Sequence, residues 1–510
     1  MLETISLENF KGFNNLKNLK IKPITILCGT NSCGKSSILQ SILLLKQTLE
    51  SQNPNQILLL NGRLVHLGSF ENIIFEKSSG NKLVFELNFQ LSKEDLIGRA
   101  KANAIPLELL IRDFFPQREL LQNQDVLIHA KFVLKAPNAR SKRTSHLKTI
   151  IVEQFQFEIE AIGSNKQKKP GACIDIKLSD NDLYTINWKN LRNRINREQS
   201  SHTGEILSAK IKFTSLFSIR PIVMKNDSAK NADILDTEVL FTIFRINNLL
   251  QAIFSSYSYL GPLREEPSRR YIYEDEITEI GVKGENAAYI YLTERDKMVS
   301  NHYFYDKKTN SFKQKKELTL SDAVQEWLDL MNIRGFKSEI KNEIVYLELN
   351  SSSASKTRVS IADVGFGVSQ IFPILLEGLR MQHRNTLLLE QPEIHLHPNL
   401  QMQLADYFIA LAKSGKRVMV ETHSDHIINR LVRRIVEDET GILKNFIAIY
   451  FISATDSGSN FEEICIDENF GVTNWPADFF DQAALEQENI LRAGLRKRQT
   501  SRINNSKIEQ

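Results

Sequence analysis

Apolar residues near the start of the chain fall into short runs with the spacing of strands and helices. Residues 2–28 alternate and then become continuously apolar, with breaks at Gly12 and Pro23, which predicts that two strands precede Gly29. Residues 38–49 then predict a helix, and residues 83–91 alternate as a strand does. This order of elements predicts an α/β lobe that begins with the first residues.

The middle of the chain, residues 92–232, is polar and rich in lysine. Strand-like alternation occurs at residues 147–162 and 206–217, so we expect an inserted lobe of β-hairpins with a few helices. No heptad repeat runs through it and prolines interrupt it, which argues against a long coiled-coil arm. Basic clusters at residues 140–143 and 166–169 are interpreted as solvated loops, with contacts to nucleic acid phosphates as the alternative.

Two buried strands are predicted in the last third of the chain, and polar residues follow both. The first run is TLLLEQPEIHLHP, residues 386–398, and the second is RVMVETHSDHIINRL, residues 417–431. Parallel strands place their C-terminal ends, where ligands bind, at one edge of the sheet. We therefore expect Glu390 to be the acid on the magnesium side, and residues 422–424 to reach the same edge.

The segment GTNSCGKSS, residues 29–37, lies between a predicted strand and a predicted helix, which is the context of a phosphate-binding P-loop. Its two glycines let backbone N–H groups turn toward phosphate oxygens, and the helix N-terminus adds the positive end of its dipole. Lys35 would reach the β- and γ-phosphates, and Ser36 would bind magnesium. The alternative is a plain glycine turn. The residues assigned to the nucleotide in this segment are Asn31, Gly34, Lys35, Ser36 and Ser37.

A second helix start with the character of an anion site is predicted within residues 361–379. Gly365 and Gly367, together with Ser369 and Gln370, come before an apolar helical run. We assign Gly367, Ser369 and Gln370 to the nucleotide as well.

An alternative interpretation of the last third of the chain is a metal cluster, formed by His395, His397, His423 and Glu393. His423 is separated from the other two histidines by a predicted helix and strand, and HLHP lacks the helical spacing of a hydrolytic zinc motif. The nucleotide interpretation is therefore preferred.

Composition narrows the class of protein without identifying it. With 42% hydrophobic and 25% charged residues and a formal net charge of +4, the 510-residue chain has an ordinary globular composition that neither demands nor excludes nucleic acid. Its four cysteines lack CxxC spacing, which argues against a disulfide framework or a zinc site. No apolar run is long enough to span a bilayer, so we expect a cytoplasmic protein without a membrane partner.

The motifs together resemble the ABC-type ATPases of the SMC and OLD-like class, especially stand-alone prokaryotic members related to anti-phage systems such as Septu. The resemblance covers residues 1–90 and 235–485. GTNSCGKSS is similar to the Walker A loop, DVGFGVSQ to a divergent signature motif, LLLEQPE to Walker B, HLHP to the D-loop and THS to the switch histidine.

The resemblance implies an α/β fold in which both chain ends form one ABC-type P-loop nucleotide-binding domain. Residues 1–91 and 233–485 would form this domain, residues 92–232 the inserted β-rich and helical lobe, and residues 486–510 a basic and polar tail. ATP and Mg²⁺ would be the cofactors. Because the chain has one P-loop, a nucleotide sandwiched between two domains requires a homodimer or a higher oligomer.

The resemblance also implies roles for single residues in that sandwich. Ser369 of the partner domain would cap the γ-phosphate, and His423 would sense it. Arg264, in LGPLRE, is either a phosphate or coupling residue or a member of a structural salt bridge.

The chain departs from the family pattern at two positions in Walker B. Glu390 stands where the family has an aspartate for magnesium, and Gln391 stands where it has the catalytic glutamate. Glutamine cannot accept a proton from water. Either Glu393 supplies the base, or hydrolysis is slow and ATP mainly holds a closed dimer.

Three functions remain open on the sequence alone. The first is an ATP-driven regulatory subunit of a prokaryotic defence complex that controls a separately encoded effector nuclease. The second is a DNA-repair or chromosome-maintenance ATPase that acts on DNA directly. The third is a scaffold that binds ATP and scarcely hydrolyses it. The step from ATPase to defence depends on analogy.

Overall fold

The structure is a computed structural model, and a defined part of the chain is described here. The described residues are 1–51, 56–78, 80, 82–92, 107–112, 114–115, 124–136, 150–163, 168–180, 183–190, 207–221, 237–272, 277–299, 301–341, 344–351, 357–364, 366–474, 476 and 485–497.

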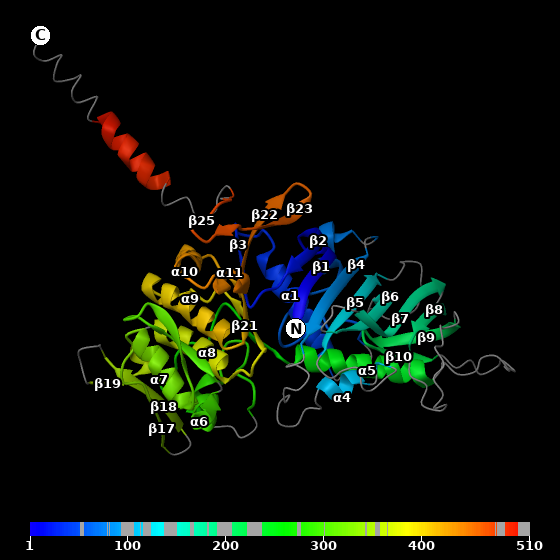
Figure 1. The fold of residues 1–510 in the computed structure, drawn as a ribbon, viewed down its shortest axis with the longest axis horizontal. Coiled ribbons are helices and arrows are strands. Elements are labelled where there is room, and N and C mark those ends of the chain that lie inside the picture. The colour runs from blue at the N-terminus through cyan, green and yellow to red at the C-terminus, as the bar shows by residue number, and fades with distance from the viewer. Residues whose placement is uncertain are drawn as a thin grey trace, which may run out of the picture.

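A mainly parallel sheet lies at the centre of the molecule and draws its strands from both ends of the chain (Figure 1). Strand β20 is buried at every position, and its apolar side chains alternate between two core clusters, as expected for a strand covered on both faces. The strands, in spatial order, are β11 (Tyr257–Leu260), β20 (Thr386–Glu390), β21 (Arg417–Glu421), β3 (Ile24–Gly29), β22 (Ile447–Thr455) and the antiparallel β23 (Gly458–Glu463).

A nine-stranded antiparallel sheet extends from one side of this centre. Strand β4 shows strict alternation of buried and half-buried positions, which is the pattern of a sheet with one covered face. Helix α1 (Lys35–Glu50) and helix α5 (Thr237–Phe254) contribute to the same core cluster as the buried face. Its strands, in spatial order, are β10 (Ser218–Pro221), β9 (Leu207–Ser215), β8 (Leu183–Lys189), β7 (Lys168–Asp180), β6 (Ile151–Ile162), β5 (Asp125–Lys135), β4 (Leu83–Leu91), β1 (Leu2–Phe10) and β2 (Phe13–Lys20).

The strands predicted within residues 147–162 and 206–217 are observed as β6 and β9, and residues 147–149 and 206 lie outside the described residues. They extend the sheet that β1, β2 and β4 begin, because β4 pairs with β5 and the buried side chains form one cluster. Three strands rather than two precede Gly29, since a turn with positive φ at Lys11 divides residues 2–20 into β1 and β2. The domain boundaries expected at residues 91/92 and 232/233 stay predictions.

Helices cover the other face of the central sheet and form the second core cluster (Figure 1). Small antiparallel sheets, including β17 (Lys337–Lys341) with β18 (Ile344–Asn350) and the hairpin of β14 (His302–Asp306) and β15 (Ser311–Lys315), flank them. The helices are α6 (Ala287–Glu294), α7 (Leu320–Leu330), α8 (Phe366–Arg380), α9 (Pro398–Lys413), α10 (Asp425–Val436) and α11 (Ile442–Phe446).

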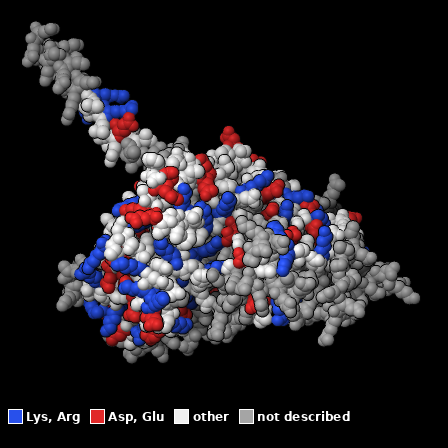
Figure 2. Space-filling model, viewed as in Figure 1, with Lys and Arg blue, Asp and Glu red and all other residues white. Residues whose placement is uncertain are grey.

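The surface over these helices carries basic and acidic side chains side by side rather than in blocks of one sign (Figure 2). Of the two basic clusters, residues 140–143 lie outside the described residues, and in the other Lys168 donates a 2.8 Å hydrogen bond to Glu160. Among the described residues, no helix is long and apolar enough to cross a membrane.

The fold confirms the α/β class and a P-loop lobe assembled from the two ends of the chain. In space, β3 lies between β21 and β22, so residues near position 30 are surrounded by residues near 420 and 450.

Candidate functional site

The loop after β3 has the backbone of a P-loop, and two glycines make it possible. Gly29 has φ +140°, and a Cβ there would lie 2.0 Å from the carbonyl oxygen of Ile452. Gly34 has φ +100° and caps the N-terminus of α1, where a Cβ would lie 2.8 Å from Ser459 Oγ. Only glycine meets both the φ and the space requirement. Asn31, between them, is exposed.

Lys35 begins α1 and is buried against the inside of this loop. Its Nζ donates hydrogen bonds to the carbonyl oxygens of Gly29, at 3.2 Å, and Thr30, at 2.5 Å. The ammonium group is thereby held at the helix N-terminus, where an anion is favoured. Ser37 follows on the same turn, and its N–H donates to Gly34.

Ser36 contacts an acid that the sequence analysis did not nominate. Its hydroxyl donates a 2.9 Å hydrogen bond to Oε1 of Glu421, the last residue of β21. The expectation that Glu390 is the acid on the magnesium side stays a prediction, but the acid in direct contact with Ser36 is Glu421. The physical reason is strand order, because β21 and not β20 is adjacent to β3.

Glu390 lies one strand further away, at the end of β20, and is paired in register with Glu421. Tyr259, on β11, donates a 3.0 Å hydrogen bond to Glu390 Oε1. Burial and the neighbouring charge of Glu421 raise the pKa of Glu390 to about 7. Burial also raises the pKa of Glu421. Two buried carboxylates therefore lie side by side at the edge where the P-loop begins.

Lys11 is a second basic group at this edge, and sequence reasoning missed it. It lies in the turn between β1 and β2 and donates a hydrogen bond to Gln40 of α1. Burial lowers the pKa of Lys11, while the charge of Glu390 opposes this change. The sequence feature that could have identified Lys11 is its position in the turn FKGF, upstream of the P-loop.

Arg264 secures the end of β20 through backbone carbonyls. Its guanidinium donates to Pro262, at 3.2 Å, to Gln391, at 3.0 Å, and to Glu390, at 3.5 Å. Burial lowers its pKa to about 10. Within the described part of the chain Arg264 forms no salt bridge and its hydrogen bonds go to the backbone, and its role as a phosphate or coupling residue stays a prediction. Gln391, whose carbonyl accepts from Arg264, has φ +45°. Its N–H donates to the Glu421 carbonyl.

Glu393 joins the loop after β20 to the loop after β21. Oε1 accepts a 2.6 Å hydrogen bond from the N–H of His423, and Oε2 accepts a 2.8 Å bond from Thr422 Oγ1. Burial raises the pKa of Glu393. Burial and the charge of Lys35 lower the pKa of His423, so this imidazole lies within electrostatic range of the P-loop. The structure thus brings the Walker B and THS segments together, as the sequence predicted.

Two residues near the start of α8 that the sequence assigned to the nucleotide are buried. Ser369 and Gln370 are 7% and 3% exposed, so their side chains pack inside the same chain. Gly367 lies nearer the surface, where a Cβ would be 3.5 Å from the carbonyl oxygen of His395. Gly365 lies outside the described residues. The assignment of Ser369 to the γ-phosphate held by a partner domain stays a prediction.

The donor set fits a hard divalent cation beside phosphate. Ser36 and Glu421 provide oxygen atoms, and Glu421 Oε2 is buried without a hydrogen-bond partner among the described residues. The alternative metal cluster of histidines is not formed, since no group of three or more His, Cys, Asp or Glu side chains within the described ranges is arranged for a metal.

A P-loop, two carboxylate-ending strands and a histidine loop at one sheet edge define the class as a P-loop ATPase domain. A family model described as "AAA ATPase domain" matches residues 1–428, and the chain belongs to this family. A second model, described as a protein of unknown function (DUF3696), matches residues 442–488. No curated protein sequence is significantly similar to the chain.

Among solved structures, similar chains include an Smc head bound to the C-terminal winged-helix domain of ScpA, with 12% identity and a TM-score of 0.41, covering 92% of this chain and 98% of that one. The SMC head domain from Thermotoga maritima has 8% identity and a TM-score of 0.35, covering 91% and 99%. An Smc head from Pyrococcus furiosus with an extended coiled coil has 11% identity and a TM-score of 0.32, covering 96% and 99%.

Proposed function

We propose that the chain is a slowly hydrolysing, homodimeric ATPase that regulates a separately encoded nuclease in a prokaryotic anti-phage complex. The observation that carries the ATPase part is the meeting of Lys35, Ser36, Glu421 and Glu390 at one edge of the sheet. Membership of the AAA ATPase family supports the same conclusion. The defence part rests on the resemblance of the motifs to OLD-like and Septu ATPases.

Slow turnover is supported by the environment of the two candidate bases. Gln391 stands at the position of the catalytic glutamate and has no basic oxygen of sufficient strength. Glu393 uses both carboxylate oxygens to accept hydrogen bonds from the THS loop. Both hydrogen bonds oppose the rise that burial gives the pKa of Glu393, and so weaken this carboxylate as a proton acceptor.

Dimerisation is supported by the single P-loop and by the start of α8. One nucleotide site in each chain is half of an ATP sandwich, and the helix N-terminus at Gly367 is the anion-receptive group for the other half. We assign this contact to the backbone near Gly367 rather than to Ser369.

Phosphate release and oligomeric state test the proposal together. We would compare wild type with Lys35→Ala, Gln391→Glu and Glu393→Gln, with Gln382→Glu beyond α8 as an exposed control of the same charge change. Wild type should bind ATP, dimerise and hydrolyse slowly, Lys35→Ala should lose binding, and Gln391→Glu should hydrolyse faster. Rapid wild-type turnover that Glu393→Gln leaves intact would refute slow hydrolysis. ATP binding without any dimer would refute the sandwich.

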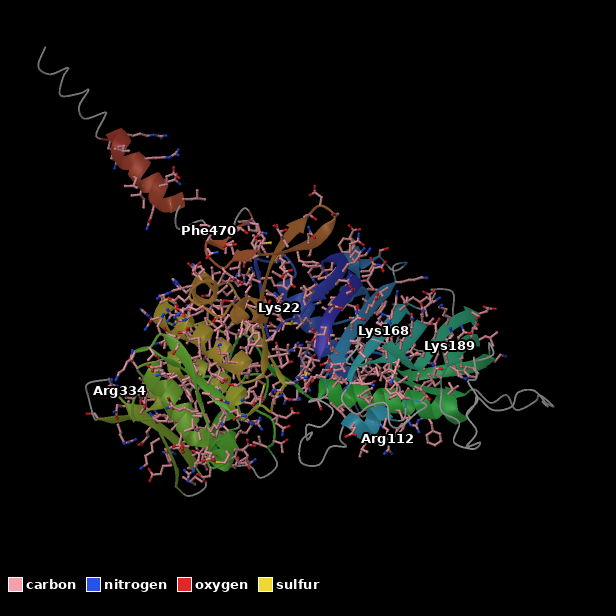
Figure 3. All side chains as sticks on the ribbon, viewed as in Figure 1. Lys22, Arg112, Lys168, Lys189, Arg334 and Phe470 are labelled. Atoms are coloured by element: carbon pink, nitrogen blue, oxygen red, sulfur yellow. The ribbon has the colours of Figure 1, made fainter. Side chains whose placement is uncertain are left out.

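A direct role on DNA is the second candidate, and the outer strands of the antiparallel sheet favour it. The described strands β8, β9 and β10 contain no acidic residue, and their solvent face carries exposed basic side chains. Figure 3 labels Lys189 on this sheet. Cross-strand pairing of Arg220 with Lys212 and alternation along β9 place these groups on one face. They are Lys189, Lys210, Lys212 and Arg220.

Salt-dependent binding to duplex DNA distinguishes this candidate. Lys210→Glu and Lys212→Glu should each weaken binding and lower the slope of log K against log salt by about one. Lys308→Glu, in the exposed turn of the β14–β15 hairpin, is the control. If all variants bind duplex DNA as tightly as wild type does, this face of the sheet is not a DNA-binding surface.

A further inference from the structure

The hydrogen bond between Ser36 and Glu421 prepares the serine oxygen for a cation. The Ser36 hydroxyl donates its proton to Glu421 Oε1 over 2.9 Å. A hydroxyl has one proton and two lone pairs, so a hydroxyl held in this direction presents its lone pairs away from the carboxylate. These lone pairs are available to a divalent cation on the phosphate side of the P-loop.

The second oxygen of Glu421 has no partner within the protein. Glu421 is 3% exposed, and its Oε2 is buried without a hydrogen bond among the described residues. An unpaired buried carboxylate oxygen is strongly unfavourable, which indicates that a ligand or its water completes the site. Every other residue of β21 is apolar after Arg417, so the carboxylate at its end is an exception in a buried strand.

Each of the three acids at this edge has a basic neighbour: Lys11 acts on Glu390, Arg264 on Glu393 and Lys35 on Glu421. Glu390 lies in register on the next strand, and Glu393 interacts with Glu421 electrostatically. Lys35 is the basic group acting on Glu421, and it is hydrogen-bonded to loop carbonyls. Bound phosphates would add further negative charge. Mg²⁺ prefers one or two carboxylates together with phosphate oxygens and water, which is the donor set assembled here.

Glu390 makes different contacts from Glu421. Its Oε1 accepts the Tyr259 hydroxyl, and β20 is separated from β3 by β21. Among the described residues, no hydrogen bond connects Glu390 to Ser36. The Walker B acid of this chain is therefore tied to the edge strand β11 rather than to the P-loop.

We propose that Glu421, with Ser36, supplies the protein oxygens of the Mg²⁺ site, and that Glu390 supports the site from the next strand. This inference rests on the proposed nucleotide function and names a carboxylate two residues before the switch histidine as the metal-side acid.

Binding of Mn²⁺ as a paramagnetic substitute for Mg²⁺, measured by electron paramagnetic resonance in the presence of ATP, tests the proposal. Glu421→Gln keeps an acceptor for Ser36 and the side-chain shape while it removes the charge, and Glu390→Gln is the matched control. We expect Glu421→Gln to weaken Mn²⁺ binding at least about tenfold and Glu390→Gln to weaken it less. Binding of ATP in EDTA should not weaken in Glu421→Gln, because the charge removed repels phosphate.

The outcomes separate this inference from the proposed function. Wild-type Mn²⁺ affinity in Glu421→Gln, with a loss in Glu390→Gln, would overturn it and return the metal to Glu390. No ATP binding by wild type, with or without metal, would refute the nucleotide function itself.

Thermal unfolding in EDTA checks folding, and Glu421→Gln should melt above wild type, since an uncompensated carboxylate is removed. Glu421→Asp, one methylene shorter, is the second variant and should also bind Mn²⁺ more weakly.

Discussion

Single residues at the sheet edge combine two tasks, because the groups that could act on a nucleotide also hold the loops in place. Glu393 is the clearest case. Its carboxylate accepts hydrogen bonds from the N–H of His423 and from the hydroxyl of Thr422, and Thr422 is fully buried. Gly29 acts through its lack of a side chain, since the carbonyl of Ile452 occupies the space that a Cβ would need.

Replacement of Glu393 should separate its positioning role from any role as a base. Glu393→Ala leaves two buried donors without an acceptor and should lower the free energy of unfolding by about 1–3 kcal/mol for each. Glu393→Gln keeps one acceptor oxygen and should be destabilised less. Urea denaturation measures both variants. If Glu393→Gln unfolds as wild type does but loses phosphate release entirely, the residue is a base rather than a positioning group.

Gly29→Ala should destabilise the protein by at least ~2 kcal/mol, because the backbone at φ +140° is strained for alanine and the new Cβ meets a carbonyl oxygen at 2.0 Å. ATP binding should be lost together with stability. Gly494→Ala is the control, since a Cβ there meets nothing within 4 Å. Calorimetric melting of the two variants is the measurement, and equal melting temperatures would contradict the clash.

Contacts between elements are most specific where β14 packs between α7 and α9. His302, in β14, accepts a 2.8 Å hydrogen bond at Nε2 from the indole of Trp327 in α7. Its Nδ1 lies 3.3 Å from Ser414 Oγ, just after α9, and that hydroxyl donates to the Ala410 carbonyl. The network therefore assigns a neutral imidazole with its proton on Nδ1.

The buried His302 should make stability depend on pH in the acid range. Burial, with a smaller effect of Lys416, lowers its pKa well below the ordinary value of 6.5. The unfolded chain binds a proton below pH 6.5 and the folded chain does not, so folding stability is full above 6.5 and decreases as the pH falls below it. His302→Gln keeps an acceptor for Trp327 and should lose this part of the pH dependence, as followed by melting temperatures between pH 5 and 7.5. An unchanged profile would contradict the neutral imidazole.

The whole molecule is organised around one sheet whose two faces belong to two core clusters. Met419 of β21 belongs to the cluster with the antiparallel sheet, while Val418 and Val420 belong to the cluster with α8 and α9. Both lobes therefore share the strands that carry Glu390 and Glu421. In contrast, residues 485–497 form a helix that projects from the body, with every described side chain exposed (Figure 1).

Removal of residues 485–510 should leave the melting temperature of the protein within about 2 °C of the full chain, because the described part of this segment buries no side chain. Nucleotide binding should also be unchanged. Differential scanning calorimetry with and without ATP is the measurement. A large loss of stability in the truncated chain would show that the helix packs on the protein in solution.

The sequence by itself determined the P-loop, the acids after one buried strand, the THS segment and the α/β class, because each is written in the spacing of a few consecutive residues. Only the tertiary structure decided that Glu421 and not Glu390 meets Ser36, that Lys11 and Tyr259 belong to the site, and that Ser369 is buried. Periodicity predicts that a strand is buried, but it does not contain the order of strands in the sheet. That order places β21 between β20 and β3, and it decides which carboxylate reaches the P-loop.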